Sequence, residues 1–185
     1  MKSRLPEIKQ EDLSPEQARI LADIVASPRG NLVGPFLAWI LSPGLAQPAQ
    51  ELGAFCRYAT SLEARLTELA ILQTASWWQS QLEWQSHEPI ARKAGLTDSV
   101  IAALRDGRTP EFKLDDERLV FQIGLAIYRD RRLHTALYNQ GVSFFGTQGM
   151  VELVGVFGYY ALAAMTMNVF EMLPEDDQPL PFPER

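Results

Sequence analysis

The pair of residues best suited to chemistry in this sequence is Glu83 and His87, which lie four positions apart in a stretch with helical periodicity. Side chains at this spacing share one face of a helix and can meet. A carboxylate beside an imidazole orients the ring, fixes its tautomer and equips the pair for proton transfer. Glutamate and histidine also occur at this spacing on solvated helices, so an ordinary surface pair is the alternative interpretation.

Tryptophans are concentrated around this pair. Trp77, Trp78 and Trp84 are three of the four tryptophans in the chain, and they fall within eight residues. We predict that they wall a partly apolar pocket, in which desolvation would shift the pKa values of the carboxylate and the imidazole. The alternative, equally consistent with the sequence, is that these indoles simply fill the core.

The elements that must hold these residues are helices, because apolar residues recur at helical spacing along almost the whole chain. Ser14-Pro15 followed by Gln17 is a capping box, Thr97 is the expected cap of a short helix to Arg105, and Gly95 is typical of the residue that ends a helix. Pro48 should confine the regular part of its helix to the later residues. Ser61 is the expected cap of the helix that follows. The predicted helices cover residues 15–26, 43–58, 62–75, 81–94, 98–105, 115–129, 133–145 and 147–172.

The chain has the length of one domain, with 185 residues of which 46% are apolar and 22% charged. We interpret residues 1–185 as a single all-α domain, with a core at about 45–105 and a C-terminal helical part at 112–173. The tail at 174–185 contains four prolines and cannot be helical, so we expect it to lie on a neighbouring element or to be disordered. Residues 153–170 carry no charge, and we interpret them as a core helix rather than a membrane span.

The net charge and the cysteine content indicate which classes of partner and which cell compartment to expect. The net charge of −6, from 17 basic and 23 acidic residues, disfavours nucleic acid and anionic lipid, so we expect a small-molecule ligand and neither nucleic acid nor membrane. Cys56 is the single cysteine and the N-terminus lacks a signal-peptide stretch, which favours the cytoplasm. We interpret Cys56 as a small buried residue and His134 as an exposed residue at a helix start. Two histidines so far apart predict no metal site, and we expect no cofactor.

Several features between residues 64 and 96 together resemble the carboxymuconolactone decarboxylase family, which includes the AhpD-like alkyl hydroperoxidases. They are the Arg65-x-x-Glu68-Leu69 helix, an aromatic linker, a histidine 19 residues after that glutamate, and Ala94-Gly95-Leu96. The resemblance is best over about residues 52–104. It implies an AhpD-like helical bundle that assembles as a homo-oligomer, either a trimer or a hexamer. A faint echo of Glu68-Leu69 at Glu152-Leu153 is consistent with two related helical halves.

The resemblance also implies a site. In the peroxidase branch a Cys-x-x-Cys precedes the histidine, but those positions are Ser80 and Glu83 here, so no disulfide cycle can run on them. The pattern is more similar to the decarboxylase branch, and the proton-relay residues of the family fall on Glu68, Glu83 and His87. On one straight helix Glu68 and His87 would lie about 28 Å apart, so the relay requires a turn near residues 77–80, with Ser80 as a cap.

The function implied is that of a cofactor-free lyase resembling gamma-carboxymuconolactone decarboxylase, which acts on a small carboxylated lactone or a related enolisable acid. His87 would deliver the proton, Glu83 would hold the imidazole, and Glu68 would complete the relay. Two alternatives stay open, a non-catalytic helical module that binds a ligand or drives assembly, and a peroxidase-type activity. Arg65 is expected to pair with Glu68. The expected substrate contacts are Trp84, Ser80, Trp77, Pro35, Phe36 and Arg57.

Overall fold

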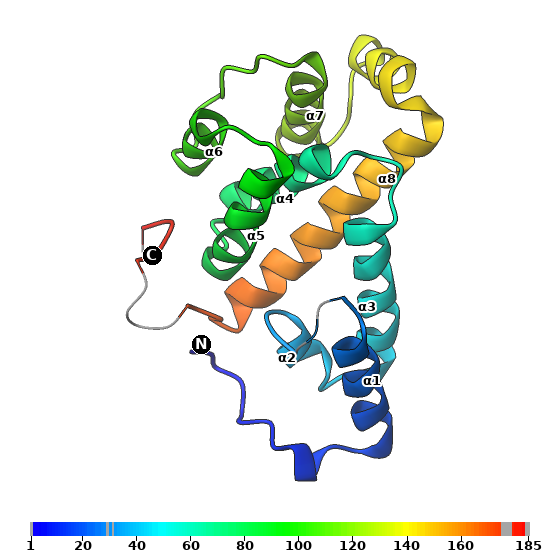
Figure 1. Cartoon of the computed structure of the whole chain (residues 1–185), viewed down its shortest axis with the longest axis vertical. Coiled ribbons are helices and arrows are strands. Elements are labelled where there is room, and N and C mark those ends of the chain that lie inside the picture. The colour runs from blue at the N-terminus through cyan, green and yellow to red at the C-terminus, as the bar shows by residue number, and fades with distance from the viewer. Residues whose placement is uncertain (1, 29, 31, 175–178, 184–185) are drawn as a thin grey trace.

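The computed structural model describes residues 2–28, 30, 32–174 and 179–183 and shows an all-α arrangement (Figure 1). A 3-10 turn at Gln10–Asp12 precedes the first helix, and a π-helical turn at Ala126–Asp130 follows the seventh. Over the described residues, the only β-type pairing is an isolated bridge between Lys2 and Leu173. The helices are α1 (Pro15–Ala26), α2 (Phe36–Trp39), α3 (Pro43–Tyr58), α4 (Ala64–Trp78), α5 (Gln81–Ala94), α6 (Asp98–Arg105), α7 (Asp115–Leu125) and α8 (Thr135–Val169).

Helix α4 is the centre of the fold. Every residue from Leu66 to Ala75 is buried, as expected for a helix that other helices surround. Helices α5, α7 and α8 all pack directly against it, and α8 crosses the molecule diagonally beside α4 (Figure 1). A residue on α4 can therefore meet side chains from three other helices.

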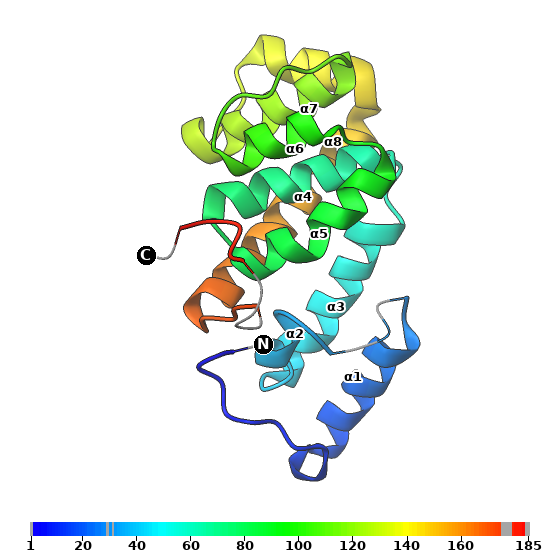
Figure 2. The ribbon, with the colours of Figure 1, turned by 60° about the vertical axis from the view of Figure 1, so that its left-hand side comes forward.

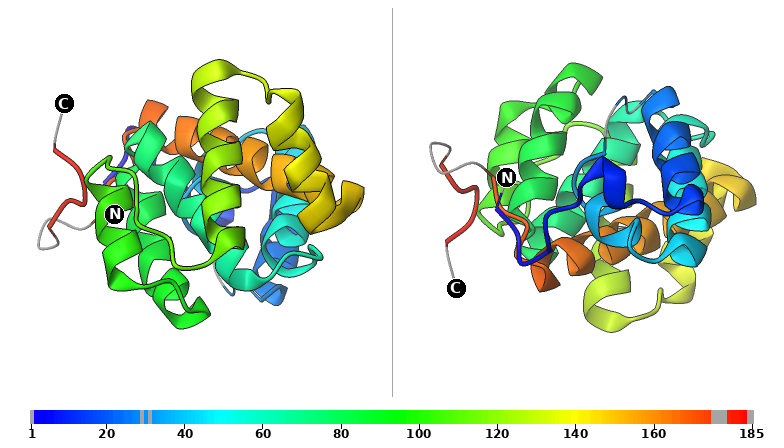
Figure 3. Two further views of the ribbon diagram at one scale, coloured as in Figure 1. Left: turned by 90° about the horizontal axis from the view of Figure 1, so that it is seen from above. Right: turned by 90° about the horizontal axis from the view of Figure 1, so that it is seen from below.

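Two groups of helices complete the fold. Helices α1, α2 and α3 lie together at one end of the molecule, and α6, α7 and the first part of α8 lie at the other (Figure 2). The views from above and below in Figure 3 show α7 and the start of α8 covering one end, and the N-terminal segment covering the other. The first and last described residues lie on the same side of the molecule (Figure 1).

The predicted helix ends are largely confirmed. Ser14 and Gln17 form the capping box of α1, Thr97 caps α6 through the Val100 amide, and Gly95 ends α5 with a φ of 108°. Helix α4 ends at Gln79, whose φ of 49° is left-handed. This turn lets α5 fold back along α4, as the predicted relay requires.

Two boundaries differ from the predictions. Helix α3 is regular from Pro43 onwards and includes Pro48, because one missing N–H removes a single hydrogen bond that the surrounding packing of the helix offsets. Helix α4 begins at Ala64 rather than at residue 62, because the Ser61 hydroxyl and amide donate to the Glu152 carboxylate instead of capping the helix.

The predicted break between the last two helices is confirmed. Gly146 has a non-helical φ of 70° and ψ of 170°, so α8 consists of two helical segments that meet at this kink.

Helix α8 and the described part of the C-terminal tail, residues 179–183, both pack against other parts of the protein. Helix α8 is long and apolar enough to cross a membrane, but 56% of its most apolar window is buried inside the molecule, so we assign it as a core helix. In the tail, residues 179–183 form no helix. The Phe182 ring packs edge-on against Trp84, with ring centroids 5.3 Å apart, and the Gln81 amide bonds both backbone groups of Phe182. The tail therefore covers the start of α5.

The close contact between α4, α7 and α8 generates a stability prediction. A Cβ added at Gly124 would lie 2.4 Å from Gln73 Oε1 and 2.5 Å from Phe157 Cζ. We expect Gly124→Ala to lower the free energy of unfolding by about 1–3 kcal/mol through overpacking. Urea denaturation followed by circular dichroism measures the change.

Gly158→Ala on α8 is the matched control, because a Cβ there meets nothing within 4 Å. Its higher helix propensity should raise the free energy of unfolding by about 1 kcal/mol. Two variants with the same sign of effect would contradict the described packing around Gly124.

Candidate active site

A buried hydrogen bond joins α4 to α5 at the centre of the candidate site. His87 Nδ1 lies 2.8 Å from Glu68 Oε2, and the two side chains are only 8% and 6% exposed. With Glu68 ionised, the Nδ1–H donates to the carboxylate and sets the tautomer of the ring. Nε2 is then the nitrogen free to exchange a proton, since it has no hydrogen bond to any described residue.

The turn between these helices forms as predicted, but Ser80 does not cap α5. Ser80 occupies the N-cap position, yet its buried hydroxyl makes no capping hydrogen bond and has no partner among the residues that the structure describes. Its amide instead bonds the Ala75 carbonyl at 2.9 Å. The left-handed Gln79 therefore provides the turn, and Ser80 follows it as a buried residue.

Glu83 does not hold the imidazole, contrary to the prediction from spacing. The carboxylate that bonds His87 Nδ1 is that of Glu68, on the facing helix α4. The Glu83 carboxyl makes no hydrogen bond to the ring among the described residues. Glu83 is 3% exposed, and neither of its oxygens has a hydrogen-bond partner among the described residues. Burial away from water raises the pKa of this carboxyl well above its ordinary value, so the neutral acid is the favoured form.

A cavity of about 400 Å³ opens beside this pair and is of a size typical for small-molecule sites. Residues from four parts of the chain converge on it: the loop before α2 and its start, α3, α5 and α8. The predicted contacts Pro35, Phe36 and Arg57 line it together with Glu83 and His87. The remaining lining residues are Val33, Gly34, Leu82, Ser86, Tyr159, Tyr160, Ala163 and Met167.

The tryptophans do not wall this cavity, which corrects the prediction for Trp77 and Trp84. Trp77 is 48% exposed and stacks on the Tyr128 ring. Trp84 is fully buried, packs against Phe182 and donates its indole N–H to Glu88. Trp84 lies between Glu83 and His87 in sequence but on another face of α5, and Trp77 belongs to the end of α4. Ser80 is also absent from the cavity lining.

Two tyrosines that sequence reasoning did not assign to the site supply its aromatic wall. Tyr159 and Tyr160 reach the cavity from α8, and the Tyr160 ring meets the His87 ring edge-on at 5.1 Å. Burial, followed by the nearby Glu68 charge, raises the pKa of Tyr160 well above its ordinary value, so the phenol stays protonated. The adjacent tyrosines in an uncharged helix were the available signal for this wall.

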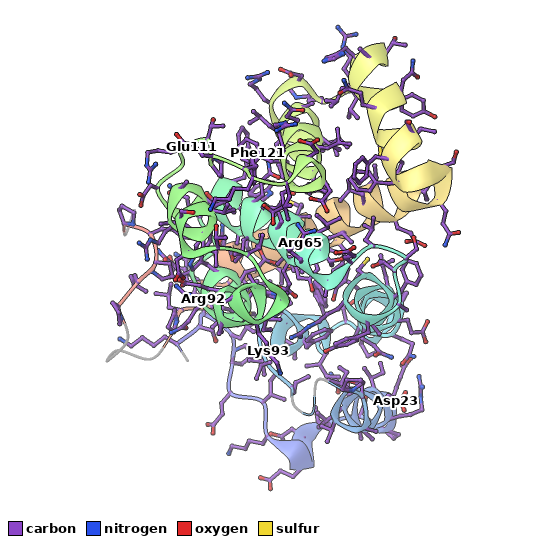
Figure 4. All side chains as sticks on the ribbon, turned by 45° about the horizontal axis from the view of Figure 1, so that its top comes forward. Asp23, Arg65, Arg92, Lys93, Glu111 and Phe121 are labelled. Carbon is purple, nitrogen blue, oxygen red and sulfur yellow. The ribbon has the colours of Figure 1, made fainter. Side chains whose placement is uncertain are left out.

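Arg65 holds α4 to α7 rather than pairing with Glu68. Its guanidinium bonds Asp116 at 2.6 Å and Glu117 at 2.7 Å, and the hydrogen bond to Asp116 is the largest cause that raises its pKa. Figure 4 shows Arg65 among the packed helices, whereas Asp23 lies at the outer edge of the molecule on α1. The predicted pair is wrong because α7 brings two acidic residues to Arg65, while His87 engages Glu68.

The remaining candidates are placed as expected. Cys56 is buried, and desolvation together with the Glu152 charge raises its pKa to about 11. His134 is exposed at the start of α8, where it accepts a hydrogen bond from the Leu137 amide.

Within the described ranges, no group of three or more histidine, cysteine or acidic side chains is arranged to hold a metal ion.

No family model matches the sequence, and no curated protein is significantly similar to it. Among solved structures, the chain is similar to the crystal structure of an alkylhydroperoxidase AhpD core, an uncharacterized peroxidase-related protein from Ralstonia eutropha JMP134. The TM-score is 0.74 at 14% sequence identity, and the match covers 95% of this chain and 93% of that one. The chain therefore has the all-α, AhpD-like fold that its sequence predicts.

The neutral Glu83 generates a prediction about stability and pH. Above its ordinary pKa of 4.5, the folded protein keeps a proton on Glu83 that the unfolded chain has released. The free energy of unfolding of the parent therefore falls as the pH rises, by up to about 1.4 kcal/mol per pH unit, until the folded-state pKa is reached. Glu83→Gln removes this loss, so its stability relative to the parent should increase with pH.

Urea denaturation of both proteins at several pH values above 4.5 tests this expectation. Glu111→Gln, which removes one carboxylate from an exposed position, controls for the change in net charge. Parallel stability curves for the parent and Glu83→Gln would contradict a raised pKa of Glu83.

Proposed function

We propose that the protein is a carboxy-lyase that removes CO₂ from a small carboxylated lactone or a related enolisable acid, using its own side chains for proton transfer. The observation that carries this proposal is the buried Glu68–His87 hydrogen bond at the edge of a largely apolar cavity. A fixed imidazole next to an enclosed space suits general acid–base chemistry on a small molecule.

The reaction balances with these residues alone. The bond between the carboxylate carbon and its neighbour breaks, CO₂ leaves, and the electron pair stays on the substrate as an enolate. The His87 imidazolium then gives the Nε2 proton to the enolate carbon and recovers a proton from solvent. Glu68 accepts the Nδ1–H bond throughout, so it orients the ring and offsets the imidazolium charge.

Convergence of the side chains favours the enzyme over a helical module that only binds a ligand or drives assembly. Glu68, Glu83 and His87 are all buried, and Glu83 and His87 line one cavity. A surface used only for assembly has no need of a buried carboxylate–imidazole pair, whose desolvation is costly.

A peroxidase-type activity is less well supported. The similar solved structure carries a peroxidase-related title, but Ser80 and Glu83 stand here where the redox cysteines of that branch would be. Cys56 lines a separate groove between α3 and α8, and its raised pKa of about 11 leaves little thiolate at neutral pH.

The test of the proposed lyase is CO₂ release from carboxylated muconolactones and β-keto acids by the purified protein. His87→Ala should lower the turnover rate by about 10²–10⁴, the usual contribution of one general acid. Water that enters the enlarged cavity can hydrate Glu68, so the variant should keep the parent's circular dichroism spectrum but lose stability, because the carboxylate has lost its imidazole partner.

His134→Ala is the matched control, since it removes the only other histidine of the chain from an exposed helix start. It should lose about 1 kcal/mol of stability through the missing cap and leave turnover unchanged. Unchanged turnover in His87→Ala would remove His87 from the mechanism.

The redox alternative has its own test. With alkyl hydroperoxides, the parent should show negligible turnover with or without a thiol reductant, because Cys56 has no resolving cysteine in the chain. Cys56→Ser should match the parent in every activity assay. Peroxide reduction that this single substitution abolishes would reverse the ranking of the two activities.

A further inference from the structure

Among the described residues, the cavity lining contains one arginine whose guanidinium pairs with no carboxylate. Arg57 on α3 lines the cavity and is half-buried there. Among the described residues its guanidinium has no hydrogen bond or ion pair. It makes a cation–π contact with the Tyr58 ring, with Cζ 5.3 Å from the ring centroid. A guanidinium in a partly apolar environment gains most from a hydrogen-bonded anion.

No carboxylate of the described residues contacts the Arg57 guanidinium. Glu83 is the one carboxyl in the described lining, and its burial favours the neutral acid. Glu68 lies outside the described lining and is bound to His87, although its charge still reaches Tyr160. Arg57 therefore offers the cavity a guanidinium whose hydrogen-bond donors a ligand can fill.

The rest of the wall suits an apolar molecule. Phe36, Leu82, Ala163 and Met167 present aliphatic and aromatic surface, and Tyr159 and Tyr160 add two phenol rings. Such walls hold the body of a ligand by burying its apolar surface, while a few polar groups set its orientation.

We propose that the cavity binds a small carboxylate with a compact apolar or aromatic body, and that Arg57 is the residue that holds the carboxylate. This inference rests on the proposed function for what happens after binding, and it adds the recognition element and the ligand class. A fork of guanidinium N–H donors pairs with both oxygens of a carboxylate, so Arg57 fixes the orientation of the ligand as well as its charge.

The test compares two probes of the same shape, phenylacetate and phenylacetamide, which differ in charge. Neither probe is activated for loss of CO₂, so calorimetric titration measures binding without turnover. The parent should bind phenylacetate about tenfold more tightly than phenylacetamide, which corresponds to one charge-assisted contact at a half-buried site. Equal affinities would overturn the proposal.

Variants then assign the preference to Arg57. Arg57→Met should bind both probes equally, whereas Arg57→Lys should keep part of the preference because the ammonium retains the charge. Arg108→Met, at an exposed arginine outside the cavity, should behave like the parent. A preference that survives in Arg57→Met would place the anion contact elsewhere and overturn the proposal.

The proposed lyase activity can fail while phenylacetate still binds at Arg57. Turnover that depends on His87 but not on Arg57 would overturn the recognition role and leave the lyase standing.

Discussion

A carboxylate can be buried in a small helical protein only if a partner compensates for its lost hydration, and this constraint organises the molecule. Glu68, Glu117 and Glu152 are each less than 8% exposed, and each bonds a partner on another element. Glu68 joins α4 to α5 through His87, and Glu117 joins α7 to α4 through Arg65. Glu152 joins α8 to the segment before α4 through Ser61. The central helix is thereby tied directly to α5 and α7, and the segment that leads into it is tied to α8.

Glu83 is the exception, and the exception lies in the candidate site. Its burial without a partner is tolerable as a neutral acid, which costs less to desolvate than a carboxylate. In the proposed function, a neutral Glu83 leaves the Arg57 guanidinium to the carboxylate of the ligand and the proton transfers to His87. Departures from the rule that buried polar groups are paired are expected where a protein carries out its function.

Local signals in the sequence were enough to predict most helices and the turn between α4 and α5. Capping residues such as Ser14, Thr97 and Gly95 act within one helical turn, so they can be recognised without knowledge of the fold. Spacing placed Glu83 beside His87, and the family resemblance added Glu68 to the same candidate site. The sequence could not choose between Glu68 and Glu83 as the partner of His87, because that choice depends on how two helices face each other. For the same reason the directions of Trp77 and Trp84, and the partners of Arg65, became clear only in the folded structure.

The order of the site residues along the chain also bears on how the cavity forms. Glu68 and His87 are 19 residues apart, whereas Tyr160, which packs on the same imidazole, lies about four times as far along the chain. Closing the longer loop costs about 1 kcal/mol more in chain entropy. The α4–α5 hairpin can therefore bring the carboxylate to the imidazole through local contacts, and the later docking of α8 encloses the space beside them.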